Sequence, residues 1–140
     1  MSGLAAVLRG DVAAGTYRWE SALEVDDVAR AVGTAHWAFG HLDGWQASTK
    51  AEVLAALGES LDFADHYGRN LDAFADCLAD LDQDRVLLWD GWSTLARAEG
   101  ATFATILGII AAQRDSAAQP RLVVLLRGPG PETADIPLLE

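Results

Sequence analysis

The sequence predicts a single α/β domain with a small three-stranded parallel sheet packed by helices. Three short apolar runs, at residues 36–42, 85–89 and 121–126, have the length and composition of buried strands. Stretches with helical spacing of apolar residues separate these runs, so each connection is long enough to join parallel strands through a right-handed crossover. The length of 140 residues and the 51% of hydrophobic residues suit one domain with a substantial core.

The first 34 residues are expected to form an extension ahead of this domain. Residues 1–16 are interpreted as a loosely attached lead-in. Residues 16–20 alternate bulky and polar side chains, which predicts a short strand that adds an edge to the sheet. Residues 25–32 fit a helix that begins with acidic residues in its first turn and ends before Gly33.

Two helices are expected between the first and second apolar runs. The first begins at a cap of Ser48 or Thr49 and ends near Gly58. The second follows Asn70, whose side chain can cap it. Its apolar residues recur at helical spacing, at Leu71, Phe74, Leu78 and Leu81.

A short helical segment around Leu95 and a longer helix at 102–112 are expected between the second and third strands. Glycine and proline residues then stop the third strand, and residues 129–140 are expected to form an irregular tail. The principal domain therefore spans residues 35–128.

The charge balance restricts the partners of the chain. Lys and Arg number 10 against 21 Asp and Glu, which gives a formal net charge of −11. Nucleic acids and anionic membranes repel such a surface, so neither is expected as a partner. The charge suits a basic protein partner, although acidity also serves solubility alone.

Cys77 is the only cysteine, so an intramolecular disulfide is impossible and a cysteine-based zinc site is not expected. The apolar run from Leu4 to Leu8 is too short for the core of a signal peptide or for a membrane span. His36 and His41 lie five apart on a predicted strand, on opposite faces, and share no metal site. We therefore expect a cytoplasmic protein without a metal or other cofactor.

Three aspartates form an acidic stripe on the predicted helix that follows Asn70. Asp72, Asp76 and Asp80 occupy positions i, i+4 and i+8, which lie on one side of a helix. Like charges at this spacing destabilise a helix by about 0.2–0.5 kcal/mol per pair. Asp72 favours the helix dipole in the first turn, but Asp76 and Asp80 have no such local reason. The stripe is either a solvated face or a binding face, and the spacing alone leaves both interpretations open.

The residues ahead of this helix, His66-Tyr67-Gly68-Arg69-Asn70, are expected to hold a loop against the stripe. Gly68 supplies a backbone conformation that other residues avoid, and Asn70 ties the loop to the helix as its cap. The loop then places His66 and Tyr67 beside the aspartates. A tyrosine at the rim of an acidic patch is typical of a binding hot spot, and packing of Tyr67 into the core is the alternative.

The stretch from His66 to Leu78 resembles the sequence pattern of the barstar-like family. That pattern is two aromatic residues, Gly, a charged residue, Asn, Leu or Trp, Asp, Ala, two variable positions, Asp, Cys and Leu. The wider resemblance runs from about Trp37 to Leu126. The chain is similar in particular to longer members from high-GC bacteria, which carry an N-terminal extension and a Trp-Asp-Gly-Trp segment like that from Trp89 to Trp92. The matching residues are Gly68, Asn70, Asp72, Ala73, Asp76, Cys77 and Leu78.

The resemblance implies a protein that inhibits a secreted microbial ribonuclease inside the producing cell and is not itself an enzyme. In the family, an acidic helix and its preceding loop enter the cationic active site, where carboxylates stand in for RNA phosphates. Carried over, Asp76 is the central phosphate mimic and Asp72 is the second carboxylate. Asn70 and Gly68 shape the loop. The implied partner-binding set is Asp76, Asp72, Asn70, Gly68, Tyr67, His66, Arg69, Ala75 and Asp80.

Several positions depart from the family pattern. His66 stands where the family has the first of two tyrosines, and Ala75 stands where it has a tryptophan. Residues 79–81 replace Thr-Gly-Trp, and no acidic residue at 109–113 matches the contact on the family's later helix. These departures indicate a microbial ribonuclease other than barnase. The expected partner is a microbial ribonuclease of the guanyl-specific type. The free protein is expected to be a monomer.

Two other functions remain open on the sequence. One is a barstar-like interaction module for another basic protein, such as a toxin effector or a regulator. A more distant alternative is a metal-dependent hydrolase in which Asp72 and Asp76 ligate Mg²⁺. The sequence shows neither a third convergent carboxylate nor a nucleophile–base pattern in support of such an enzyme.

Overall fold

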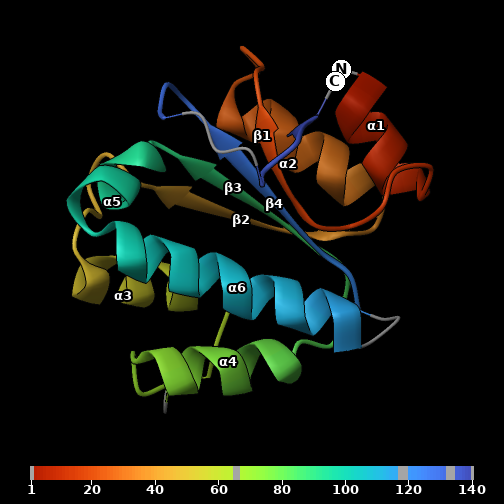
Figure 1. The fold of residues 1–140 in the computed structure, drawn as a ribbon. Coiled ribbons are helices and arrows are strands. Elements are labelled where there is room, and N and C mark those ends of the chain that lie inside the picture. The colour runs from red at the N-terminus through yellow and green to blue at the C-terminus, as the bar shows by residue number, and fades with distance from the viewer. Residues whose placement is uncertain (1, 65–66, 117–119, 132–134, 140) are drawn as a thin grey trace.

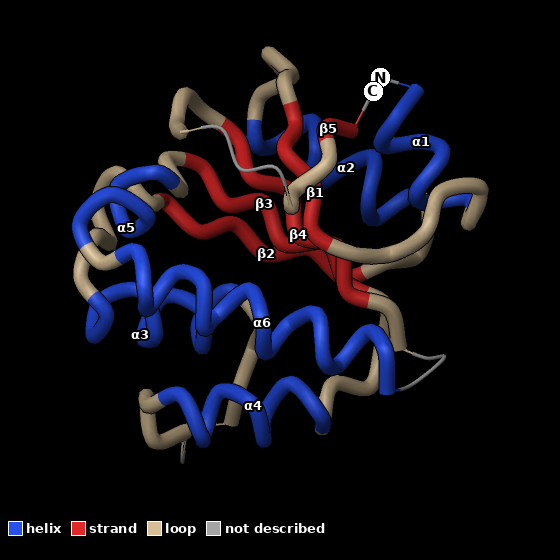
Figure 2. The backbone as a smooth tube through the Cα atoms, viewed as in Figure 1, coloured by secondary structure: helices blue, strands red, loops and turns tan. Residues whose placement is uncertain are grey.

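The computed structural model describes residues 2–64, 67–116, 120–131 and 135–139, and it shows a parallel sheet with helices on both faces (Figures 1 and 2). The helices are α1 (Ser2–Arg9), α2 (Val25–Thr34), α3 (Lys50–Ser60), α4 (Leu71–Ala79), α5 (Ser93–Ala98) and α6 (Gly100–Ser116). The strands are β1 (Thr16–Trp19), β2 (Ala38–Asp43), β3 (Arg85–Asp90), β4 (Leu122–Arg127) and β5 (Leu138–Leu139).

The described strands are ordered β2-β3-β4-β1-β5, and each neighbouring pair is parallel. The three predicted strands are β2, β3 and β4, so the α/β class and the parallel pairing are confirmed. The predicted number of strands is wrong, because β1 and β5 complete a five-stranded sheet. β1 is also not an edge: Tyr17 is in register with Leu125 of β4, and Trp19 is in register with Leu139 of β5.

Two peripheral segments predicted to be loose or irregular are packed against the sheet. The N-terminal segment folds as α1, with Leu4 and Val7 each 1% exposed. The C-terminal tail provides β5, in which Leu139 is buried. The physical reason is that Val86 and Leu88 present a second apolar face of β3, and this face needs a cover. Sequence periodicity shows that a strand is apolar on both sides, but not which distant segment covers it.

Side chains alternate along the strands and fill one core on each face of the sheet. Leu87 and Trp89 of β3 join the core beneath α3, α4, α5 and α6, while Val86 and Leu88 join the core beneath α1 and α2. Figure 1 shows these two groups of helices on opposite faces. α4 packs on α3 and α6 as the outermost layer of its side, which leaves one of its faces toward solvent (Figure 1).

Local signals set several element boundaries. Thr49, one of the two predicted caps, begins α3. Its side chain accepts a hydrogen bond from the backbone N–H of Glu52 in the first turn. Gly33 does not end α2, which continues to Thr34. β2 begins at Ala38 and not at residue 36, because His36 has a φ of 68° and lies in a turn.

Candidate protein-binding site

The sequence from Asn70 onward folds α4 as a fixed platform. Asn70 has an extended backbone, and its Oδ1 accepts a hydrogen bond of 2.8 Å from the N–H of Ala73. This is the predicted cap. Phe74 and Leu78, at i and i+4, are buried in the core shared with α3 and α6. Their burial fixes the rotation of α4 about its axis, and therefore fixes which residues face outward.

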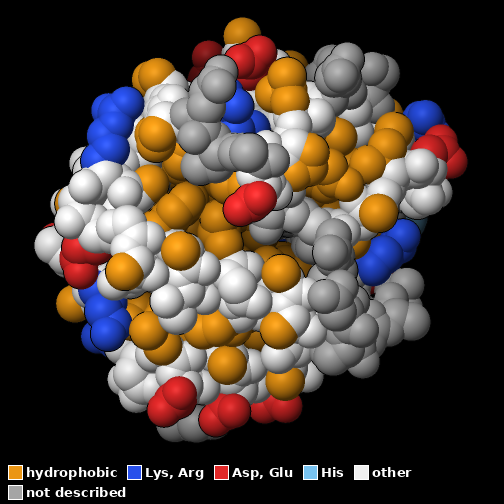
Figure 3. All heavy atoms as spheres, viewed as in Figure 1, with side chains coloured by type: hydrophobic (Ala, Val, Ile, Leu, Met, Phe, Trp, Pro, Cys, Tyr) orange, Lys and Arg blue, Asp and Glu red, His pale blue; other side chains and the backbone are white. Residues whose placement is uncertain are grey.

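The outward residues include the acidic stripe. Asp72, Asp76 and Asp80 are all exposed, and none of their carboxylates has a hydrogen bond or ion pair within the part of the chain that the structure describes. Asp80 lies just beyond α4, where its N–H bonds to the carbonyl of Cys77. Acidic side chains gather over α4 on the face shown in Figure 3. The structure therefore brings the three predicted carboxylates together on one solvent-facing surface.

The loop ahead of α4 has the expected turn but a different residue makes it. Arg69, and not Gly68, has the left-handed backbone, with a φ of 56°. The predicted reason for Gly68 is thus wrong. A Cβ on Gly68 would lie 3.2 Å from the Asn70 side-chain nitrogen, so the glycine leaves room for the cap. His66 lies outside the described residues.

Tyr67 lies inward, in agreement with the core alternative. Its ring forms an edge contact with Phe63, with 5.0 Å between centroids, and covers Gly58 so closely that a Cβ there would lie 2.7 Å from the ring. The phenol oxygen is buried without a hydrogen-bond partner among the described residues. Burial raises the pKa of Tyr67 to about 12. Tyr67 therefore anchors the loop on α3.

Two further residues of α4 lie beside the aspartates. Cys77 is half-buried, and burial followed by the charges of Asp80 and Asp76 raises the pKa of its thiol. The thiol therefore stays protonated near neutral pH and is a poor nucleophile. Ala75 is half-buried and places no large side chain beside Asp72 and Asp76. The face offers fixed negative charge and no group suited to covalent chemistry.

A second cluster of charges lies at the carboxyl ends of the strands, and the sequence interpretation did not identify it. Asp90 of β3 accepts bonds from Arg127 of β4 at 2.6 and 3.0 Å and lies 2.9 Å from Nε2 of His41 of β2. Burial favours the neutral acid, but the bonds from Arg127 and His41 outweigh burial and lower the pKa of Asp90. A polar residue at the end of each of these strands is the signal that was present in the sequence.

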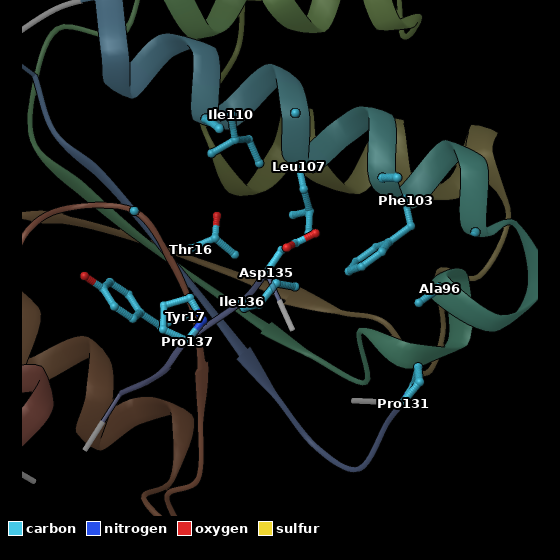
Figure 4. Close-up of a pocket in the computed structure, with 15 residues that line it drawn as sticks. Thr16, Tyr17, Ala96, Phe103, Leu107, Ile110, Pro131, Asp135, Ile136 and Pro137 are labelled. Carbon is cyan, nitrogen blue, oxygen red and sulfur yellow. The ribbon is translucent and has the colours of Figure 1, made fainter. Parts of the chain in front are cut away.

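An apolar pocket of about 580 Å³ opens between α6 and the C-terminal segment (Figure 4). Phe103, Leu107 and Ile136 line it together with the carboxylate of Asp135. No residue of α4 belongs to its lining. Because its walls are apolar, it does not complement a cationic active site.

Neither a metal-binding cluster nor a membrane-crossing helix is found in the described ranges. No group of three or more His, Cys, Asp or Glu side chains there is arranged to hold a metal ion. No described helix has both the length and the apolar character needed to cross a bilayer.

Comparison with known families decides the relationship. The family model of Barstar, the barnase inhibitor, matches residues 37–126, which is well over half of the chain. This chain belongs to the barstar family. The matched region begins just before β2 and ends within β4, so α1, β1, α2 and β5 lie outside the barstar family match. A search of the curated proteins found no match.

A similar solved structure is the ORC2 protein of Aeropyrum pernix in ADPNP–ADP complexes. The TM-score is 0.63 at 14% sequence identity, and the alignment covers 92% of this chain and 39% of that chain. At this identity the likeness concerns the fold alone. It includes the segments outside the barstar match, since 92% of the chain is aligned.

Proposed function

We propose that the protein inhibits a secreted microbial ribonuclease of the guanyl-specific type. The observation that carries the proposal is the outward face of α4, where Asp72, Asp76 and Asp80 are exposed and have no partner among the described residues. A ribonuclease active site must be cationic to hold phosphate, so carboxylates fixed on one face complement it. Membership of the barstar family supports this choice of partner.

Inhibition follows from occupation of the phosphate site. Asp76 lies in the middle of α4, where a bound partner excludes water most completely, and its carboxylate accepts hydrogen bonds from enzyme cations in place of a phosphate oxygen. Asp72 in the first turn and Asp80 at the end of the helix meet cations on either side. Since α4 is already packed and capped, docking costs little conformational entropy.

The preceding loop shapes the edge of this face. Gly68 and Asn70 set the path of the loop into α4, and Arg69 turns it through a left-handed conformation. Tyr67 anchors the loop from beneath. A contact from His66 is supported only by the family resemblance. Ala75 leaves space where the family has a tryptophan, so the cognate enzyme must present a bulkier surface there.

The same proposal includes a non-enzymatic role, a monomeric free state and a location inside the producing cell. The location follows from the inhibitory role, because an inhibitor that protects cellular RNA must bind the ribonuclease before the enzyme is exported. The formal charge of −11 supports the monomeric state, because two copies of the chain repel each other.

A nucleotide is not part of the proposal, although the similar ORC2 structure holds ADPNP and ADP. Open α/β sheets bind ligands outside the carboxyl ends of their strands, where the strand order reverses. Here Arg127 occupies that end, bonded to Asp90 and to the carbonyl of Leu23 at 2.7 Å. The connection from β1 to α2, residues 20–24, has no glycine and carries two glutamates. Phosphate has no cradle there.

A panel of purified guanyl-specific microbial ribonucleases tests the proposal. Titration with the protein should abolish the activity of at least one enzyme near one-to-one ratio, while the protein alone leaves RNA intact. No inhibition of any enzyme at micromolar protein would favour the alternative, a barstar-fold module for another basic protein. Ala75 and the lack of an acidic residue at 109–113 are the observations that keep this alternative. Capture from the secreted proteins of the producing organism then identifies the partner.

A further inference from the structure

β2 forms one edge of the sheet and has an open side. The N–H groups of Ala38 and Gly44 bond to the carbonyls of Asp84 and Asp90 on the β3 side. Since successive residues of a strand direct their backbone groups to alternate sides, the odd-numbered residues of β2 direct theirs to the open side.

The open side presents unpaired donors. The N–H groups of Phe39, His41 and Asp43 have no hydrogen-bond partner within the described residues. Among the carbonyls, that of His41 accepts from the Ser60 hydroxyl at 2.9 Å, and that of Asp43 accepts from the following turn. The carbonyl of Phe39 is free among the described residues. The edge can therefore pair with a short extended segment, through three donors and one free acceptor.

A groove of about 670 Å³ runs along this edge, between β2 and α3. α3 contributes Glu52, Ala55, Ala56 and Glu59, which lie at i, i+3, i+4 and i+7 and therefore on one face of the helix. The two alanines leave space beside the strand, and the two glutamates stand at either end of that face. The space is thus bounded by backbone donors on one side and by a small-residue helix face on the other.

The charges around the groove have one sign. Its charged lining residues are Asp43, Glu52, Glu59 and Asp62, of which Asp62 is already bonded to the buried Arg85 at 3.2 Å. Bonds from the backbone of Ser48 and Thr49 lower the pKa of Glu52, which keeps it ionised. The other titratable lining residue, His41, is bonded to Asp90. Exposed edge strands are commonly protected by Lys or Pro, and β2 has neither.

We propose that this groove binds an extended basic segment of a partner protein, which adds a strand to β2. Backbone pairing to the open edge supplies the affinity, and basic side chains along the segment meet the carboxylates of Asp43, Glu52 and Glu59. Charge complementarity selects this occupant: nucleic acid is repelled, and so is a second copy of a chain with net charge −11. The site shares no residue with the acidic stripe of α4 and does not depend on the proposed inhibition.

The test uses an acetylated, amidated peptide Arg-Val-Arg-Val-Arg and the full-length protein. On binding, the amide signals of Phe39, His41 and Asp43 should shift in nuclear magnetic resonance spectra, and their hydrogen exchange should slow. A peptide with proline in place of the central arginine removes a backbone donor and should bind more weakly. Glu59→Lys should weaken binding about fivefold, since it removes one exposed ion pair and adds a repulsion. Ala55→Arg fills the groove and should abolish binding.

The matched control is Asp76→Lys, which makes the same charge change on α4. It should leave peptide binding unchanged, while Glu59→Lys leaves ribonuclease inhibition unchanged, so the two proposals fail separately. Equal loss in Asp76→Lys and Glu59→Lys, or shifts confined to α4, would overturn the groove assignment. Absence of peptide binding at millimolar concentration would overturn it as well. Thermal melts establish that each variant is folded.

Discussion

Two sets of carboxylates in this protein differ in what surrounds them. On α4, Asp72 and Asp76 are exposed and have no partner among the described residues. At the carboxyl end of the sheet, Asp90 is 18% exposed, beside an Arg127 that is 14% exposed, and it accepts two bonds from that guanidinium. One residue type thus has two roles: the paired carboxylate stabilises the fold, and the unpaired ones remain available to a partner.

The ion pair of Asp90 and Arg127 at the end of the sheet joins separate segments of the chain. Arg127 bonds to Asp90 of β3 and to the carbonyl of Leu23 in the connection between β1 and α2. It therefore links the N-terminal extension to the strands of the barstar match. Asp84 forms a second such pair within the barstar match, where it accepts bonds of 2.7 Å from both the backbone and the guanidinium of Arg121. The comparison with α4 shows that carboxylates paired with arginine hold parts of the fold together, whereas the carboxylates of α4 are exposed to solvent.

The largest expected effect is on stability, from Asp90→Ala. The substitution leaves the Arg127 guanidinium in a largely buried place without its carboxylate, which typically costs about 3–5 kcal/mol. Urea denaturation should show this loss in the free energy of unfolding, while affinity for the ribonuclease stays at the parent value under native conditions. Asp11→Ala, which breaks an exposed pair with Arg9, is the control and should cost less than about 1 kcal/mol. Equal losses of unfolding free energy in the two variants would contradict the claim that the buried pair stabilises the fold more than an exposed pair does.

The opposite pattern is expected for Asp76→Ala. Truncating one partner of a buried charge pair costs about 2–5 kcal/mol of binding, a range drawn partly from the barnase–barstar complex itself. Binding should therefore weaken by about a hundredfold or more, mainly through faster dissociation measured by surface plasmon resonance. The free energy of unfolding should change by less than about 0.5 kcal/mol, since the side chain is exposed. A folded Asp76→Ala protein with parental affinity would show that α4 carries no phosphate mimic.

The pH dependence of stability should follow the paired set. Burial raises the pKa values of Asp90 and Asp84, but the bonds from Arg127, His41 and Arg121 outweigh it, so both pKa values lie below the ordinary one. The unfolded chain then binds more protons than the folded one as pH falls through the ordinary value of about 3.9. Stability from these pairs is complete above about pH 5 and is lost progressively below it.

Chemical denaturation at pH 7, 5, 4 and 3 measures this dependence. The Asp90→Asn protein should be less stable at pH 7 and show a shallower decline toward pH 3 than the parent. A parent and variant with parallel declines would mean that Asp90 is not the titrating group.

The smallest expected effect is that of Asp80→Ala, at the end of the acidic stripe. Here the carboxylate steers association more than it holds the complex, so the association rate should fall about two- to threefold at low salt. The dissociation rate should change little. Stopped-flow measurements at low and high salt check this, and an effect that is independent of salt would place Asp80 in a direct contact instead.

Elements with local signals were predictable. β2, β3 and β4 follow from short apolar runs, and the start of α4 follows from the cap at Asn70. Elements that depend on distant partners were not. The segments of α1 and β5 were predicted to be loose and irregular. Neither has a local sequence pattern that indicates which face or edge of the sheet it packs against. The left-handed turn at Arg69 is of the same kind, because the tight contact of Gly68 with Asn70 depends on the folded loop.

The candidate site divides in the same way. The common face of Asp72 and Asp76 follows from helical geometry and appears in the structure as predicted. The position of Tyr67 does not, since only the folded loop brings its ring over Gly58. The pair of Asp90 and Arg127 required knowing that β3 and β4 are neighbours in register, with these two residues opposite each other.

The most direct test of the central claim is the mode of inhibition. Initial rates of a sensitive guanyl-specific ribonuclease, measured over a range of RNA and protein concentrations, distinguish an occupied phosphate site from a remote effect. We predict competitive inhibition: the apparent KM for RNA rises with protein concentration, and kcat at saturating RNA is unchanged. A lowered kcat with an unchanged KM would show that the carboxylates of α4 do not occupy the substrate's phosphate site.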